Sequence, residues 1–232
     1  MALNLQTFKT RTLTAIIFAA VMLIGLLWNG WSFIILFTII HFGCWYEFVK
    51  LMKKIRPKDF GYYVSLGVLY ITFPVLMMLD ISLPFFDSEY NSNLFQIVKY
   101  YSPLFPCAII FSIWINDTMA YVVGSFIGKT PFSKISPKKT WEGTIGGAVL
   151  CVAVISLASW LILHEVKVFA IISLLCAVFG TLGDLLESKL KRMANVKDSG
   201  TIMHGHGGFL DRFDSLLIAV PFVWAYVCLF IK

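Results

Sequence analysis

The chain has 232 residues, of which 59% are hydrophobic and 14% charged, and its formal net charge is +6. Soluble domains carry about 25% charged residues, so this composition excludes a soluble globular protein and indicates an integral membrane protein. The five cysteines lie in apolar runs without a CxxC pair. We therefore interpret them as small buried side chains rather than as disulfide partners or zinc ligands.

Seven apolar runs are long enough to cross about 30 Å of hydrocarbon. In chain order they cover roughly residues 12–28, 31–49, 62–79, 103–127, 145–163, 168–186 and 214–231. Only Asn29-Gly30 separates the first two runs, which predicts a tight turn and a helical hairpin. The first run continues to Trp28 and lacks a convincing cleavage site, so we expect a retained span rather than a signal peptide. The predicted fold is an all-α, polytopic membrane protein with about seven transmembrane helices.

The basic residues cluster on one side of this predicted membrane topology. The clusters on that side are Lys9 with Arg11 and the basic residues within 50–58, 129–139 and 189–212. The other side holds Lys99, Lys167 and Lys232. Because basic loops stay in the cytoplasm, the N-terminus is predicted to be cytoplasmic, in a multi-pass protein of the cell inner (cytoplasmic) membrane.

Three carboxylates stand inside apolar spans, where an ionisable group usually faces a partner, a cavity or an ion. They are Glu47, Asp117 and Asp184. The simplest interpretation of Glu47 is pairing with a lysine of the adjacent basic loop. Asp117 shares a helical face with Gly124 and Gly128. Close helix packing explains these glycines, but it does not explain the aspartate.

A first polar segment, residues 128–143, mixes lysines, hydroxyl groups, a proline and a tryptophan. Its polar candidates are Ser136, Lys138, Lys139, Thr140 and Glu142. The lysines have two explanations that the spacing alone does not separate. They either mark the cytoplasmic side of the membrane or, together with the hydroxyl groups, bind phosphates.

A second polar segment, residues 185–215, follows Asp184 and combines carboxylates, cations, glycines and histidines. Carboxylates suit Mg²⁺, and the natural ligands here are Asp184, Asp211 and Asp214. The natural phosphate-binding cations are Lys191, Arg192, Lys197 and Arg212. His206-Gly207-Gly208 predicts a flexible loop whose backbone approaches phosphate closely, although His204 and His206 are also compatible with solvated loop positions. Phosphoryl or nucleotidyl transfer needs this combination of metal, carboxylates and cations.

Motifs of several other chemistries are missing from the sequence. It contains no GxxxxGK[ST], GxGxxG, GxSxG or HExxH pattern. P-loop, dinucleotide-dependent and serine-hydrolase mechanisms therefore have no support.

The second polar segment resembles the sequence pattern of the phosphatidate cytidylyltransferase (CDP-diacylglycerol synthase) family. The residues that match are Ser188, Leu190, Lys191, Arg192, Lys197, Asp198, Gly200, His206, Gly207, Gly208, Phe209, Asp211, Arg212, Phe213 and Asp214. The chain departs from the pattern at Met203 and His204. Three upstream stretches also resemble the family: 117–124, 136–143 and 183–188. The likeness covers about residues 110–215.

The resemblance implies transfer of CMP from CTP to phosphatidic acid, with CDP-diacylglycerol and pyrophosphate as products. It implies catalytic roles for Asp184, Lys197, Asp198, His206, Asp211, Arg212 and Asp214. It implies substrate binding by Asp117, Ser136, Lys138, Lys139, Thr140, Glu142, Ser188, Lys191 and Arg192. The implied metal ligands are Asp184, Glu187, Asp211 and Asp214.

The resemblance also predicts the cofactor, the partners and the division of the chain. Mg²⁺ is the expected cofactor, and a second metal ion is compatible with this ligand set. The expected partners are CTP, phosphatidic acid and membrane lipid, with no nucleic acid, and a homodimer is compatible with the sequence. We divide the chain into three N-terminal spans (1–100) and a catalytic transmembrane region (101–232) with cytoplasmic loops 128–144 and 187–213.

Two other functions stay open from the residues alone. A CTP-dependent lipid kinase of the dolichol-kinase kind would use similar chemistry but would release CDP. A transporter would use Asp117 and Asp184 to line a pathway, and it would leave the Asp211–Asp214 segment without a role.

Overall fold

The computed structural model describes residues 5–83, 94–200 and 207–231, with side chains from Thr12 onward. The described residues form helices and no strand, so the predicted all-α class is confirmed. The helices are α1 (Leu5–Leu27), α2 (Gly30–Ile55), α3 (Phe60–Gly67), the π-helical turn η1 (Val68–Thr72), α4 (Phe73–Ser82), α5 (Leu94–Lys99), α6 (Leu104–Ile127), α7 (Trp141–Ile162), α8 (Val166–Met193) and α9 (Leu210–Phe230).

The membrane-spanning character of the fold is confirmed by the length and hydropathy of these helices. Within the described residues, six helical segments are long and apolar enough to cross a bilayer: α2, the continuous α3–η1–α4 segment, α6, α7, α8 and α9. The apolar part of α1, Thr12–Leu27, is shorter. Six of the seven predicted spans of a polytopic membrane protein are thus confirmed, and the first predicted span, 12–28, corresponds to this shorter helix.

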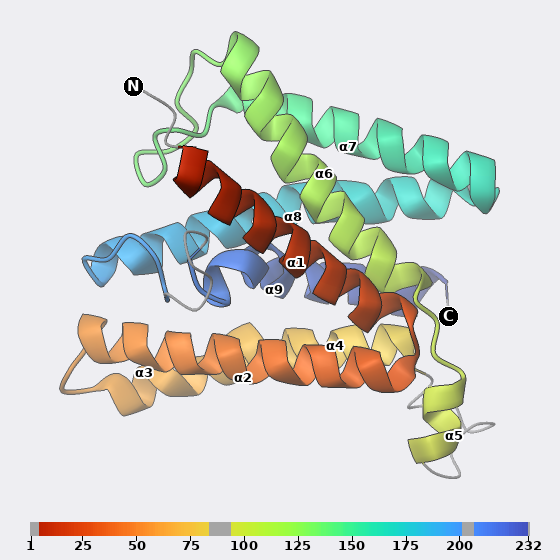
Figure 1. Cartoon of the computed structure of the whole chain (residues 1–232), viewed down its shortest axis with the longest axis horizontal. Coiled ribbons are helices and arrows are strands. Elements are labelled where there is room, and N and C mark those ends of the chain that lie inside the picture. Colours follow the sequence, from red (N-terminus) through yellow and green to blue (C-terminus); the bar gives the residue numbers. More distant parts are fainter. Residues whose placement is uncertain (1–4, 84–93, 201–206, 232) are drawn as a thin grey trace.

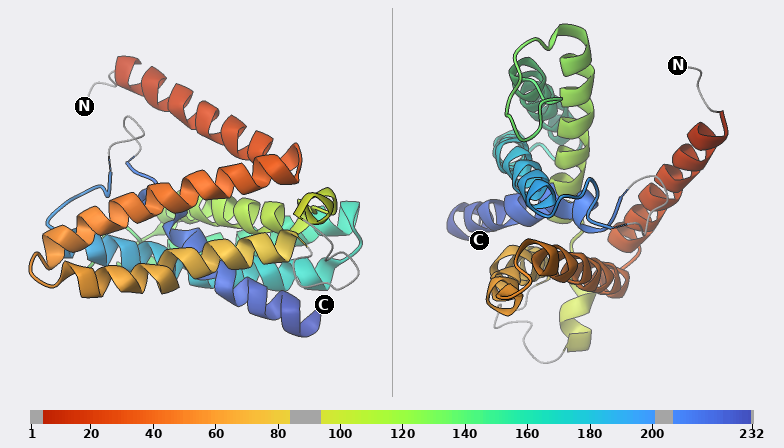
Figure 2. Two further views of the ribbon diagram at one scale, coloured as in Figure 1. Left: turned by 90° about the horizontal axis from the view of Figure 1, so that it is seen from below. Right: turned by 90° about the vertical axis from the view of Figure 1, so that its left-hand side faces the viewer.

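The helix α9 lies in the middle of the bundle and packs between α8 on one side and α4 with α2 on the other (Figure 1). Beyond α8 lies α7, and α6 packs against α7 and crosses α8. Figure 2 shows α1 diverging from the other helices toward its N-terminal end. It stays in contact through Phe18, whose ring lies 6.3 Å from that of Trp114 and 6.0 Å from that of Phe213.

The turn between α1 and α2 follows from two polar residues. Asn29 is the N-cap of α2: its side-chain oxygen accepts a hydrogen bond from the Ser32 N–H at 2.9 Å, and the Ser32 hydroxyl accepts one from the Asn29 N–H at 3.1 Å. This reciprocal capping box satisfies N–H groups that a helix start leaves without partners. The predicted hairpin at Asn29-Gly30 is therefore confirmed.

The third span contains a π-helical turn with an identifiable cause. Pro74 has no N–H, and in a regular α-helix its ring would clash with the carbonyl of Tyr70, four residues earlier. The helix widens instead, and the Phe73 N–H donates to the carbonyl of Val68, five residues back. Such π-turns occur mostly as single turns inside α-helices. The predicted span 62–79 is thus one interrupted helix from Phe60 to Ser82.

Small residues bring α6 and α7 together, as the glycine spacing predicts. A Cβ atom on Gly147 would lie 2.7 Å from the side chain of Ala120, and one on Gly128 would lie 2.5 Å from the Thr140 hydroxyl. Gly124 also faces Thr140 and Gly143. The glycine face of α6 is therefore a packing seam against the start of α7.

Three helix ends differ from the predicted boundaries. The helix α8 continues to Met193 and α9 begins at Leu210, so the predicted loop 187–213 is shorter at both ends. Residues 187–193 are mostly strong helix formers, which explains the extension of α8. Similarly, α7 begins at Trp141, because Thr140 accepts a hydrogen bond from the Gly143 N–H at 3.1 Å and caps it. The division into regions 1–100 and 101–232 stays a prediction.

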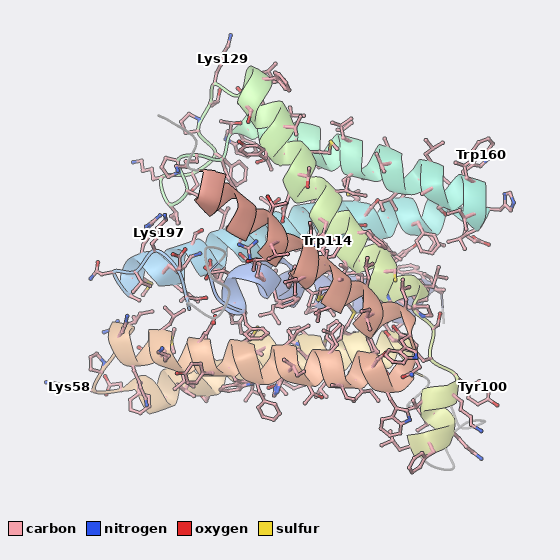
Figure 3. The ribbon with its side chains drawn as sticks, in the orientation of Figure 1. Lys58, Tyr100, Trp114, Lys129, Trp160 and Lys197 are labelled. Atoms are coloured by element: carbon pink, nitrogen blue, oxygen red, sulfur yellow. The ribbon has the colours of Figure 1, made fainter. Side chains whose placement is uncertain are left out.

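The basic loops gather at one end of the bundle. Figure 3 places Lys58, Lys129 and Lys197 at this end, and Trp160 and Tyr100 toward the opposite end. We call it the basic end. Three loops separated in sequence therefore share one side, as the charge pattern predicts, whereas the cytoplasmic orientation of that side stays a prediction.

Replacing Gly147 with alanine is expected to weaken the contact between α6 and α7, because the new methyl group would sit too close to the backbone of Ala120. Overpacking of this kind costs about 1–3 kcal/mol. Gly61→Ala is the matched control, since no atom lies within 4 Å of the added carbon. Thermal unfolding in detergent should show a lower midpoint for Gly147→Ala alone, and equal midpoints would contradict the packing described.

Candidate active site

A cavity of about 600 Å³ opens between α6, the 128–140 loop, α7 and α8. Ligand sites in proteins typically enclose ~300–1,000 Å³, so it has the size of a small-molecule site. Its lining residues are Asn116, Asp117, Ala120, Tyr121, Gly124, Ser125, Ser136, Lys138, Lys139, Thr140, Thr144, Thr181 and Asp184. Hydroxyl groups, two lysines and two carboxylates from four separate segments thus line one cavity.

An ion pair between Lys139 and Asp184 joins two of these segments. The Lys139 ammonium contacts the Asp184 carboxylate, and both side chains remain partly exposed. The other carboxylate oxygen of Asp184 accepts a hydrogen bond from the Ser188 hydroxyl at 3.3 Å. The pair therefore lies in the cavity with access for a ligand that competes for either charge.

Two further carboxylates lie close to this ion pair. Asp117 lines the cavity, and Asp214, on α9, is within electrostatic range of both Asp117 and Asp184. The positive charges of Lys139 and Arg212 act on Asp117. Three carboxylates at membrane depth repel one another, so the site favours a bound cation.

The 128–140 loop owes its shape to Glu142. This carboxylate accepts hydrogen bonds from the backbone N–H groups of Lys129 and Thr130, each at 3.2 Å. The loop is closed further by the Trp141 N–H, which donates to the Thr130 carbonyl at 3.0 Å. Glu142 therefore folds the segment that carries Lys138 and Lys139 and is not among the residues that line the cavity.

A second polar cluster forms around Asp211, at the start of α9. One carboxylate oxygen of Asp211 pairs with the Lys191 ammonium at 2.6 Å. The other accepts from the Ser199 N–H at 2.9 Å and the Gly208 N–H at 2.8 Å, and it lies 2.9 Å from the Ser199 hydroxyl oxygen. Both oxygens are thus engaged in tying the chain after α8 to the start of α9.

Lys191 links this cluster to a buried glutamate. Its ammonium contacts the carboxylate of Glu187 one turn earlier on α8, and the Glu187 side chain is 0% exposed. One lysine is therefore shared between Glu187 and Asp211. An unpaired charge at this depth would be costly, so Lys191 stabilises both carboxylates.

The contacts of Glu47 differ from the interpretation made from the sequence, in which Glu47 pairs with a lysine of the adjacent loop. Rather than pairing with a lysine, it accepts hydrogen bonds from the Phe209 N–H at 2.9 Å, the Leu210 N–H at 2.9 Å and the Ser199 hydroxyl at 2.7 Å. Its residue is only 1% exposed. The start of a helix has unpaired N–H groups and a partial positive charge, so the buried carboxylate caps α9 from α2.

Glycines make the approach of Glu47 and Asp211 sterically feasible. A Cβ atom on Gly200 or Gly208 would collide with the Glu47 carboxylate, and one on Gly207 would lie 2.5 Å from a carboxylate oxygen of Asp211. Gly207 also has a φ of +82°, which other residues rarely adopt. The glycines around residue 207 are therefore required by the packing of two carboxylates.

The region that contains both clusters matches a known protein family. The cytidylyltransferase family model matches residues 100–230. The phosphatidate cytidylyltransferase of Rickettsia felis is 32% identical over 231 residues, which cover 95% of this chain and 92% of the relative. The chain belongs to this family.

Two further relatives match about half of the chain. The phosphatidate cytidylyltransferase of Bacillus subtilis is 44% identical over 130 residues, covering 54% of this chain and 47% of the relative. That of Synechocystis is 43% identical over 119 residues, or 50% of this chain and 41% of the relative. These alignments span somewhat less than half of each of these two relatives. The resemblance inferred from the sequence, and with it the class of nucleotidyltransferases, is confirmed at the level of the family.

The structure separates the site residues predicted from the family pattern into three groups. Those that line the cavity are Asp117, Ser136, Lys138, Lys139, Thr140 and Asp184. Those outside the lining but bonded to other described residues include Glu142, Glu187, Ser188, Lys191, Asp211 and Asp214. Lys197, Asp198, Arg192 and Arg212 are exposed, and Figure 3 places Lys197 at the basic end. His206 lies outside the described residues, as do Met203 and His204.

Glu47, Ser199 and Thr181 are among the contributors that were not predicted as site residues. Glu47 was visible as a lone carboxylate in an apolar span, but its partners lie more than 150 positions away. Ser199 joins Glu47 to Asp211 and gave no separate sequence signal. Thr181, on α8, lines the cavity one turn before Asp184 and resembles an ordinary residue of a span.

The carboxylates suit a metal ion that is shared with a phosphate ligand. Within the described part of the chain, no group of three or more His, Cys, Asp or Glu side chains converges on one point. Mg²⁺ commonly uses only one or two carboxylates together with substrate phosphates, so Asp184, with Asp214 nearby, fits this mode. Asp211 and Glu187 fit less well, because Lys191 occupies both.

Replacing Glu47 with glutamine is expected to destabilise the start of α9, because one amide oxygen cannot accept the bonds that two carboxylate oxygens accept. Each buried donor left without a partner costs about 1–3 kcal/mol. Lys50→Gln, an exposed position one turn away, is the control. Thermal unfolding and protease cleavage within 195–209 should both reveal the loss, and wild-type behaviour of Glu47→Gln would contradict the capping role.

Proposed function

We propose that this protein transfers CMP from CTP to phosphatidic acid, forming CDP-diacylglycerol and pyrophosphate in phospholipid biosynthesis. The reaction would take place at the cytoplasmic face of the cell inner membrane, at the basic end of the bundle. The observation that carries the proposal is the Lys139–Asp184 ion pair inside a cavity of nucleotide size. Membership of a family whose relatives bear the name phosphatidate cytidylyltransferase supports it.

The cavity offers separate groups for the parts of CTP. Lys138 and Lys139 provide positive charge for the triphosphate, and Ser136 and Thr140 provide hydroxyl groups beside them. Asp117 and Asn116 lie on the α6 wall of the same cavity. When a triphosphate enters, its charge competes with Asp184 for Lys139, so binding frees the Asp184 carboxylate.

The proposed reaction depends more on positioning of the two phosphates than on a general acid or base. A phosphate oxygen of phosphatidic acid attacks the α-phosphorus of CTP, the bond between the α-phosphorus and the bridging oxygen breaks, and pyrophosphate leaves with that bonding pair. The lipid phosphate is already an anion at neutral pH, so no strong base is required. The protein's own part is to orient both phosphates and to hold cations near the charge that builds up.

Mg²⁺ is the cofactor we propose, held by Asp184 with Asp214 close by. When bound, it would neutralise phosphate oxygens of the nucleotide and of the departing pyrophosphate. The exposed cations at the basic end would attract the lipid phosphate and the leaving pyrophosphate. These are Lys197, Arg192 and Arg212.

The direct test is to supply the purified protein with CTP, Mg²⁺ and phosphatidic acid in mixed micelles. We expect equal amounts of CDP-diacylglycerol and pyrophosphate, and none when either substrate or Mg²⁺ is omitted. Formation of CDP instead of pyrophosphate would indicate a lipid kinase. The absence of any lipid product, in protein shown to be folded, would overturn the proposal.

Asp184→Asn is expected to lower kcat by roughly 10²-fold or more, the scale for losing one charge-stabilising group. The substitution leaves the size of the side chain nearly unchanged but removes its charge. Asp59→Asn is the matched control, because Asp59 is exposed at the same end and makes no side-chain cap bond. Initial rates of pyrophosphate release measure both variants, and a kcat within twofold of wild type for Asp184→Asn would remove it from the site.

A further inference from the structure

A second hollow lies apart from the candidate active site, between α2, the α3–η1 segment and α8. Its volume is about 250 Å³. The residues that line it are Phe48, Met52, Ile55, Arg56, Tyr63, Leu66, Tyr70, Leu186, Leu190 and Met193. We call it the apolar slot, because Arg56 is the only charged residue among them.

The slot is elongated along the helix axes. Each of the three helical segments contributes residues that are seven positions apart, which places them on one helical face two turns from each other. These pairs are Phe48 with Ile55, Tyr63 with Tyr70, and Leu186 with Met193. Seven residues of helix rise about 10 Å, so the slot has the direction and narrow form of an extended hydrocarbon chain in a bilayer.

Positive charge marks the outer end of the slot, at the basic end of the molecule. Arg56 follows the last residue of α2, and its guanidinium lies 5.6 Å from the centre of the Tyr63 ring. Lys53, Lys54 and Lys58 are exposed around it. An occupant with an apolar chain and an anionic head group would therefore match the slot at both ends.

The slot and the candidate active site lie on opposite faces of α8. At about 100° per residue, Leu186, Leu190 and Met193 are turned by roughly 180–240° from Asp184. The buried pair of Glu187 and Lys191 occupies the helix between them. A lipid held in the slot would therefore be separate from a lipid that reacts beside Asp184.

We propose that the apolar slot binds an anionic phospholipid of the surrounding bilayer, with one acyl chain between α2, α3–η1 and α8 and its phosphate at Arg56. This lipid is a bound partner and is not the substrate. It ties the end of α8, which carries Glu187 and Lys191, to the N-terminal spans. The slot thus adds a lipid-binding site to the protein that is independent of the proposed reaction.

The test measures the thermal midpoint of the protein in phosphatidylcholine nanodiscs that contain increasing fractions of phosphatidylglycerol. The midpoint of the wild type should rise and saturate. Arg56→Gln should raise the fraction of phosphatidylglycerol needed for half saturation about fivefold, because one basic residue near an anionic lipid surface contributes about 1 kcal/mol. Leu186→Trp, which fills the inner end, should abolish the rise, and water-soluble glycerophosphoglycerol should produce none.

Matched variants separate the slot from general effects of charge and bulk. Lys50→Gln removes the same charge from α2 outside the slot, and Leu174→Trp adds the same ring to a lipid-exposed position of α8. Both should retain the wild-type response. An equal response in all variants, or none in the wild type, would overturn the proposal. So would a raised KM for phosphatidic acid in Leu186→Trp without phosphatidylglycerol, because the slot would then hold the substrate.

Discussion

The carboxylate of Glu47 is the interaction on which the arrangement of this protein most depends. It lies inside an apolar span, where an unpaired charge is costly, and it accepts three hydrogen bonds from Ser199, Phe209 and Leu210. These bonds fix where α9 begins, and therefore where Asp211 and Asp214 stand. One residue of the N-terminal half thus positions the carboxylates of the C-terminal half, although the family model matches only residues 100–230.

The helix α8 connects the two polar clusters. Asp184 faces the cavity and pairs with Lys139, whereas Glu187 and Lys191, one and two turns later, join the cluster around Asp211. Asp184, Glu187, Lys191 and Asp211 are therefore carried by packed helices, whereas Lys139 lies on the loop that Glu142 folds. A rigid support of this kind keeps cations and carboxylates in place without reorganisation, which is what electrostatic catalysis requires.

The fold could be predicted from local sequence features, and part of the site could not. Apolar runs and the Asn29-Gly30 turn were sufficient to place the spans. The family pattern predicted Ser136, Lys139 and Asp184 as site residues, and all three line one cavity. The partners of Glu47 depend on contacts between distant helices, which no local pattern contains. Asp211 was predicted as a metal ligand from its type, but its bonds to Lys191, Ser199 and Gly208 become visible only once these residues are placed. The extension of α8 likewise changes residues 187–193 from loop to helix.

Transfer of CMP to a lipid phosphate can be followed with two labels of CTP. One preparation carries label in the α-phosphate and the other in the γ-phosphate, and each is incubated with the purified protein, Mg²⁺ and phosphatidic acid. We expect the α-label to enter the lipid and the γ-label to be recovered in pyrophosphate. Recovery of the γ-label in the lipid, or of neither label there, would contradict this expectation.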